Sequence, residues 1–139
     1  MLHLPRCSGI LLHPTSLPGR FGIGEFGSGA ELWLETLHRM GQKLWQILPL
    51  GPTGYGNSPY QSLSSFAGNS LLISFDALVR DGILRPDDLA LLPEFPDDQV
   101  AFGPVIEVRT AFLKLAAWRF ITHCGASPLL HRAFEASCE

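Results

Sequence analysis

The stretch SGAELWLETLHRMGQKLWQILPL, residues 28–50, decides the fold that we predict for this chain. In its first half, apolar residues recur at helical spacing at Ala30, Trp33, Leu34 and Leu37. Ser28 with Glu31 three positions later forms a capping-box pattern, and Gly41 is a typical helix-ending residue. We therefore predict an amphipathic helix from Ser28 to Met40.

A short apolar run flanks this helix on each side. Lys43–Leu48 (KLWQIL) is closed by a proline, and Ser8–Leu12 (SGILL) ends in the breaker cluster HPTSLPG, so we predict two buried strands. A strand, a helix and a second strand in this order predict a right-handed parallel unit. The sequence thus favours the α/β class.

Composition limits the kind of protein this can be. The chain has 139 residues, 46% hydrophobic and 17% charged, which predicts one compact core rather than a disordered segment. The formal net charge is -3 and the basic residues are scattered, so nucleic acid is not expected as a partner. Pro5, Arg6 and Pro14 interrupt the apolar N-terminus, which argues against a signal peptide or a membrane helix. Three widely spaced cysteines without a C-x-x-C pair favour reduced thiols in a cytoplasmic protein.

Gly22, Gly24 and Gly27 (GIGEFG) spell the dinucleotide-binding pattern G-x-G-x-x-G ahead of the predicted helix. That motif requires a tight turn directly from strand to helix and an acidic residue at the end of the next strand. Here a segment containing Pro14 and Pro18 separates the strand from the glycines, and the second strand ends without an acidic residue. A glycine turn that enters a helix is the favoured interpretation.

The later part of the chain carries weaker patterns. Leu71–Phe75 is predicted to be extended, and Pro86 with Asp87 and Asp88 suits the first turn of a helix. The stretch LLPEFPDDQVAFGPVIE predicts an irregular surface connection, followed by a helix over residues 107–124. The apolar positions of that last helix are Val108, Ala111, Phe112, Leu115 and Ala116.

The loop Gly51–Ser62 (GPTGYGNSPYQS) follows the carboxyl end of the second predicted strand, the edge where parallel α/β folds bind ligands. Sugars present apolar faces and hydroxyls, so a site for them needs aromatic rings together with amides and hydroxyls. The loop supplies these groups from Tyr55, Tyr60, Asn57, Ser58 and Gln61. An Ω-loop packed by its own tyrosines would have the same composition, so the residue types leave both interpretations open.

Four segments, SGILLHPTSLPG, FGIGEFG, KLWQILPLGPTGYGNSPYQSLSSFAGN and LLIS, resemble in order and spacing the N-terminal part of the 4-α-glucanotransferases, also called amylomaltases or disproportionating enzymes. The resemblance runs from about Arg6 through Asp81, and PEFPDDQVAFGPVIE and FEASC extend it. It implies a (β/α)8-barrel enzyme related to the α-amylases. Such an enzyme transfers α-1,4-glucan segments to glucose or another α-glucan with retention, and uses no metal or organic cofactor.

The same resemblance implies roles for particular residues. Tyr60 would line the subsite that holds the sugar to be transferred, with Ser58 and Gln61 as neighbouring glucan contacts. Tyr55 matches a tyrosine that some members use in an accessory glucan site. The expected partners are maltooligosaccharides and amylose.

A complete barrel needs ~250 residues, so residues 1–139 are predicted to be a truncated, N-terminal portion of the catalytic barrel. Retaining transfer requires two carboxyl groups roughly 5 Å apart, and the resemblance implies that the catalytic acids lie on later strands. No catalytic residue is therefore assigned, and the isolated chain is expected to be inactive. The acids at 31, 35, 87 and 88 are expected on solvated faces and in caps, and Asp76 is a lone carboxylate near the binding edge. The alternative function is a non-catalytic glucan-binding module.

Three further polar or aromatic residues stand near this edge. We expect His13 to hydrogen-bond neighbouring loop backbone rather than a ligand, and Trp45 to pack within its strand. Asn69 is expected to order the long loop through its side-chain amide.

Overall fold

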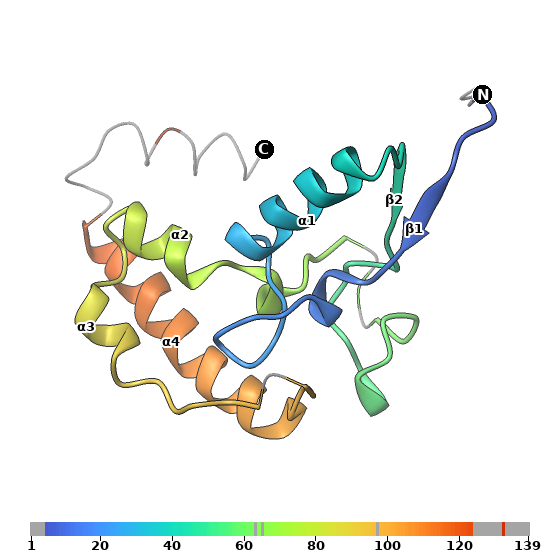
Figure 1. Ribbon diagram of the computed structural model, residues 1–139. Helices are drawn as coiled ribbons and strands as arrows, with labels where there is room; N and C mark the ends of the chain where they lie inside the picture. The colour runs from blue at the N-terminus through green and yellow to red at the C-terminus, as the bar shows by residue number, and fades with distance from the viewer. Residues whose placement is uncertain (1–4, 63, 65, 97, 124–131, 133–139) are drawn as a thin grey trace.

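The computed structural model describes residues 5–62, 64, 66–96, 98–123 and 132. In chain order, the elements are β1 (Gly9–Leu11), η1 (Pro14–Ser16), α1 (Ser28–Arg39), β2 (Leu44–Gln46), η2 (Tyr55–Asn57), η3 (Ser70–Leu72), α2 (Phe75–Arg80), α3 (Pro86–Leu89) and α4 (Phe102–His123), where η denotes a single 3-10 turn. The two strands lie at one end of the molecule, α2, α3 and α4 lie at the other end, and α1 lies between them (Figure 1).

β1 and β2 pair in parallel, which confirms the predicted strand, helix and strand unit. Ile10 lies opposite Trp45 in the ladder. The prediction that both strands are buried is wrong, because Leu11, Leu44 and Ile47 are 56%, 39% and 38% exposed. The physical reason is that the described part of the sheet consists of these two strands, so their outer edges have no strand neighbours.

Helix α1 begins at Ser28 as predicted and ends at Arg39, one residue before the predicted Met40, but its N-cap differs from the prediction. Gly27 occupies the N-cap position and no side chain caps the helix, so the capping box predicted at Ser28 is wrong. Gly27 packs directly against Ser74, whose Oγ would lie 2.6 Å from an added Cβ, so a residue without a side chain is required at this N-cap. At the other end, Gly41 adopts a φ of 73°, which stops the helix as expected.

The glycines of GIGEFG lie in the connection from β1 to α1, as the turn interpretation predicts. Gly22 has a φ of 79°, and an added Cβ would lie 2.6 Å from Phe95 and 2.7 Å from Val105. A residue without a side chain is therefore required for the turn and for its packing against the start of α4.

The prediction of an extended segment at Leu71–Phe75 is wrong. The Asn69 Oδ1 accepts a hydrogen bond from the Leu71 N–H at 3.0 Å and begins η3. The Ser74 Oγ accepts one from the Ala77 N–H at 3.3 Å and begins α2. Two side-chain caps thus convert a short apolar run into two helical turns.

Helix α3 begins at Pro86 as predicted, and the Asp88 carboxylate accepts the Arg85 N–H at 2.7 Å. Helix α4 begins at Phe102 rather than at residue 107, so the end of the stretch predicted to be irregular is helical. The predicted end of this helix, at residues 124 and 125, lies outside the described residues.

The predicted buried face of α4 is confirmed at Ala116, which is buried, and at Phe112 and Leu115, which pack against the same cluster. Ala111 is exposed, and Val105 and Arg109 are buried in addition. Two apolar clusters pack on this face. The buried members of the first are Phe21, Phe75, Leu84, Leu89 and Ala116, and those of the second are Ile23, Leu71 and Val105.

Candidate functional site

The segment from Gly51 to Asn69 follows β2 and closes on itself at its base. The Asn69 N–H donates to the Leu50 carbonyl at 2.8 Å, which joins the two ends of the segment. Inside it, Thr53 and Ser62 form an antiparallel bridge. We call this segment the 51–69 loop. Its closed base holds it at the carboxyl end of the parallel pair.

The backbone of the 51–69 loop explains two of its unusual residues. An added Cβ at Gly54 would lie 2.5 Å from the carbonyl oxygen of Gln61, so the two sides of the loop approach too closely for a side chain. Asn57 adopts a φ of 56°, a left-handed conformation that asparagine tolerates better than most residues. The described part of the loop therefore has a defined backbone conformation in which its two sides lie close together.

Tyr60 lies at the tip of a small turn and is 71% exposed. The Ser58 Oγ accepts the Tyr60 N–H at 3.3 Å, and the Ser58 carbonyl accepts the Gln61 N–H at 3.2 Å. The Gln61 side chain is exposed, and Ser58 is half-buried. The Tyr60 ring is thus not used to pack the loop, and the turn brings the three predicted contact residues together.

Tyr55 is the remaining predicted site residue. Its backbone lies in η2, and its side chain lies outside the described residues. The accessory role expected of Tyr55 stays a prediction.

A cavity of about 220 Å³ lies at the carboxyl ends of both strands. Its lining residues come from the ends of β1 and β2, from the 51–69 loop and from the start of α4: His13, Thr15, Ser16, Ile23, Leu48, Thr53, Asn57, Pro59, Asn69, Leu71 and Phe102. Of the five polar loop residues chosen from the sequence, Asn57 is among them. Tyr60, Ser58 and Gln61 are not among the described residues that line it.

His13 lines this cavity and hydrogen-bonds its own loop, as expected. Its Nδ1 lies 2.7 Å from the Thr15 Oγ1 and accepts the Thr15 N–H at 3.4 Å. The Nε2 is buried and has no hydrogen-bond partner among the described residues. Burial lowers the pKa of His13 below its ordinary value, and the Pro49 backbone partly opposes this shift. A neutral ring at neutral pH follows from these surroundings.

Trp45 joins the two strands, and Asn69 has a structural role through its cap of η3 rather than the predicted ordering of the loop by its side-chain amide. The Trp45 Nε1 donates to the Leu12 carbonyl at 2.8 Å, which ties β2 to the end of β1. Asn69 is buried, and its side chain caps η3 directly after the loop. Trp45 therefore supports the site from outside the cavity, whereas Asn69 both caps η3 and lines the cavity.

The carboxylates of the described residues do not form a catalytic pair. No Asp or Glu belongs to the described lining of the cavity. Asp76 lies 3.6 Å from Arg20 on an exposed face, and Asp88 pairs with Arg119. This pairing, together with the Arg85 N–H, lowers the pKa of Asp88 to about 2.

Glu31, Glu35 and Asp87 are exposed, as predicted. In the described part of the chain, no group of three His, Cys, Asp or Glu side chains could hold a metal ion.

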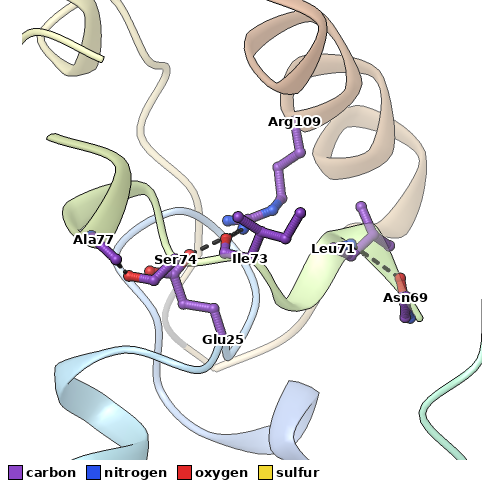
Figure 2. A network of polar contacts seen from close by, with 7 residues as sticks. All are labelled: Glu25, Asn69, Leu71, Ile73, Ser74, Ala77 and Arg109. Atoms are coloured by element: carbon purple, nitrogen blue, oxygen red, sulfur yellow. Dashed lines mark hydrogen bonds and ion pairs between the residues drawn. The ribbon is translucent and has the colours of Figure 1, made fainter. Parts of the chain in front are cut away.

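Sequence reasoning missed Arg109. This residue is fully buried, and its Nη2 donates to the Glu25 Oε2 at 2.9 Å and to the Ile73 carbonyl at 2.5 Å. Figure 2 shows the side chain reaching from α4 toward the segment that follows the 51–69 loop. An arginine on the apolar stripe of a helix was the signal that could have revealed it.

Comparison with known proteins identifies the relatives of this chain. A family model described as 4-alpha-glucanotransferase matches residues 12–139. The chain belongs to the 4-α-glucanotransferase family. It is 50% identical over 134 residues to a 4-alpha-glucanotransferase of Synechocystis sp.. This alignment covers 96% of this chain and 26% of the relative. The enzyme of that name from Thermus thermophilus is 46% identical over 135 residues, again covering 26% of the relative.

Comparison of the fold with solved structures agrees with the comparison of the sequences. The structure matches an amylomaltase from Streptococcus agalactiae in complex with acarbose with a TM-score of 0.84 and 40% identity. The match covers 96% of this chain and 27% of the amylomaltase. The family resemblance predicted from the sequence is confirmed, and the chain spans about a quarter of the length of these relatives. None of the described helices is long and apolar enough to cross a membrane.

Proposed function

We propose that residues 1–139 are the N-terminal portion of the catalytic (β/α)8 barrel of a 4-α-glucanotransferase. In the full-length protein this barrel transfers α-1,4-glucan segments to glucose or another α-glucan with retention. The observation that carries the proposal is the exposed Tyr60 ring in the loop that follows the carboxyl end of β2, in a member of this family. In parallel barrels this end of the strands carries the active site.

The 51–69 loop contributes glucan contacts. The Tyr60 ring offers a flat apolar face to a sugar ring, and the neighbouring Ser58 and Gln61 supply hydrogen-bonding groups to its hydroxyls. Maltooligosaccharides and amylose are the substrates that this chemistry suits. The amylomaltase with the similar fold was solved with acarbose, which supports an α-glucan as the ligand. Tyr55 would extend these contacts to a longer glucan.

The transfer chemistry requires groups from the rest of the enzyme. A retaining mechanism uses a carboxylate nucleophile and a carboxylic acid roughly 5 Å apart, and the described cavity lining holds neither. The chain would therefore bind and orient the glucan, while carboxylates outside it would form the covalent glycosyl-enzyme intermediate and pass its glucan segment to a hydroxyl of the acceptor sugar. A cytoplasmic location is part of this proposal, although the potato relative is named chloroplastic/amyloplastic.

A non-catalytic glucan-binding module is the second candidate. The absence of carboxylates from the described cavity lining favours it for the isolated chain. The two candidates differ in whether the full-length protein transfers glucan.

The test incubates the full-length protein and the isolated 139-residue chain separately with maltotriose. We expect the full-length protein to produce glucose and longer oligomers, and the isolated chain to produce neither. No transfer by a folded full-length protein that binds maltotriose would support the binding module. Transfer by the isolated chain would contradict the division of roles.

A further inference from the structure

We propose that Arg109 is a positioning residue that holds the 51–69 loop in its glucan-contacting conformation. The inference rests on the proposed function, because the loop is the part of the chain assigned to the glucan. Arg109 lies on α4 and is not among the described residues that line the cavity.

The contacts of Arg109 join two connections that leave the same edge of the sheet. Glu25 belongs to the connection from β1 to α1, and Ile73 belongs to the segment between the 51–69 loop and α2. One guanidinium nitrogen, Nη2, donates to both. The guanidinium carbon also lies 4.2 Å from the centroid of the Phe75 ring. Arg109 thus fixes the backbone where the 51–69 loop returns to the helices.

A short series of hydrogen bonds connects the backbone next to Ile73, which Arg109 holds, with the base of the 51–69 loop. The Leu72 carbonyl, next to Ile73, accepts the Phe26 N–H at 2.9 Å. The Leu72 N–H in turn donates to the Asn69 carbonyl at 3.0 Å, and the Asn69 N–H donates to Leu50. Every step between Arg109 and the loop base is therefore a described contact.

The free-energy cost of burying the Arg109 cation is an argument that the orientation of its side chain is important for the structure. A fully buried cation loses its hydration, and here Nε and Nη1 have no hydrogen-bond partner among the described residues. Burial lowers the pKa of Arg109, and Glu25 opposes this shift. A hydrophobic side chain would fill the same core without this cost, so the ion pair is retained for orientation. A lysine ammonium cannot reproduce the planar stacking on Phe75.

Arg119 provides a matched control on the same helix. It pairs with Asp88 of α3 and donates to the Ile83 carbonyl at 3.5 Å. Removing it breaks an ion pair of α4 without touching Glu25, Ile73 or the loop base.

The experiment measures transfer from maltotriose by the full-length enzyme with Arg109→Met, Arg109→Lys and Arg119→Met, at a temperature where circular dichroism shows every variant folded. We expect Arg109→Met to lower kcat/KM by about tenfold, mainly through a higher KM, because a misplaced loop weakens glucan binding. Arg109→Lys should fall between this variant and the wild type. Arg119→Met should stay within about twofold of the wild type. Equal kcat/KM values for Arg109→Met and Arg119→Met would overturn the proposal.

If Arg109→Met does not fold, the double variant Glu25→Gln with Arg109→Met replaces it, since it leaves no unpaired buried charge. Hydrogen exchange supplies a readout independent of activity. We expect faster exchange of the Asn69 and Leu72 amides in the Arg109 variants than in Arg119→Met. Unchanged exchange there would also overturn the proposal. An inactive wild type with this exchange difference would refute the proposed function and leave the anchoring of the loop standing.

Discussion

The backbone N–H of Asn69 donates to the carbonyl of Leu50 at 2.8 Å, so the 51–69 loop begins and ends at one point. This point lies just beyond the carboxyl end of β2 and beside the cavity that Asn69 lines. The loop is thus held by its base, while its tip, with Tyr60, faces solvent.

Replacing Tyr60 with alanine in the full-length enzyme should lower kcat/KM by roughly ten- to a thousandfold, or ~1.4–4 kcal/mol of transition-state stabilisation. The melting temperature should hardly change, because the ring is 71% exposed. Tyr60→Phe, which keeps the ring, should retain most of the activity. Kinetics on maltotriose and amylose, with melting curves, check this. Wild-type kinetics for Tyr60→Ala would show that the ring does not contact the glucan.

Replacing Asn69 with alanine should destabilise the loop base. The lost cap of η3 corresponds to about 0.5–2 kcal/mol of unfolding free energy, since the Asn69 Oδ1 accepts the Leu71 N–H. Asn69→Asp keeps an acceptor oxygen and serves as the control. Denaturant unfolding of the full-length enzyme measures the difference. Equal losses in both variants would mean that the amide group acts through something other than the cap.

Asp88 should make stability depend on pH. Its folded pKa of about 2 lies below the ordinary 3.8, so its stabilising contribution is present above the ordinary value and is lost as the pH falls toward 2. The melting temperatures of the wild type and Asp88→Asn should therefore differ at pH 7 and converge near pH 2. Asp87→Asn, on the exposed neighbour, is the control and should show little difference at either pH. A constant gap between wild type and Asp88→Asn would contradict the role of the carboxylate charge.

The isolated 139-residue chain should self-associate. Leu11 and Leu44 are exposed on the two strands, and Ile47 is exposed directly after β2. The outer edges of these strands are unpaired in the described structure, and such edges recruit further strands. Light scattering and thermal melting check this, with Leu11→Lys and Leu44→Lys together as a variant that should reduce association. A monomer at high concentration with a sharp cooperative transition would instead indicate an autonomous domain.

The parts of the fold that follow from local pattern could be predicted from the sequence. The residues of α1 and the parallel pairing of its flanking strands are such parts, because periodicity and breakers specify them locally. The segment Leu71–Phe75 could not be read in this way, since Asn69 and Ser74 lie before runs too short to show a period. Its true structure was signalled by two cap residues rather than by hydrophobic spacing.

The candidate site also has a part that could be predicted from the sequence and a part that could not. Ser58, Tyr60 and Gln61 are predicted as glucan contacts because the loop composition and the family motif mark them, and the structure places them in one turn. Their contact with a glucan stays a prediction. The cavity beside them could not be predicted, because it joins His13, Asn69 and Phe102 from distant segments. Arg109 was missed because a charge within an apolar stripe is visible in the sequence, while its partners Glu25 and Ile73 are not.

The Arg109 and Glu25 pair also bears on the order of events in folding. The two residues are 84 positions apart in the chain, so their contact closes a long stretch of backbone and its entropic cost must be met by structure already formed. Helices such as α1 and α4 depend on nearby residues and can form before it. We therefore expect this ion pair to be absent from the folding transition state, so that it slows unfolding and leaves the folding rate almost unchanged. The pair would thus give the native state of this region kinetic stability, because it slows unfolding.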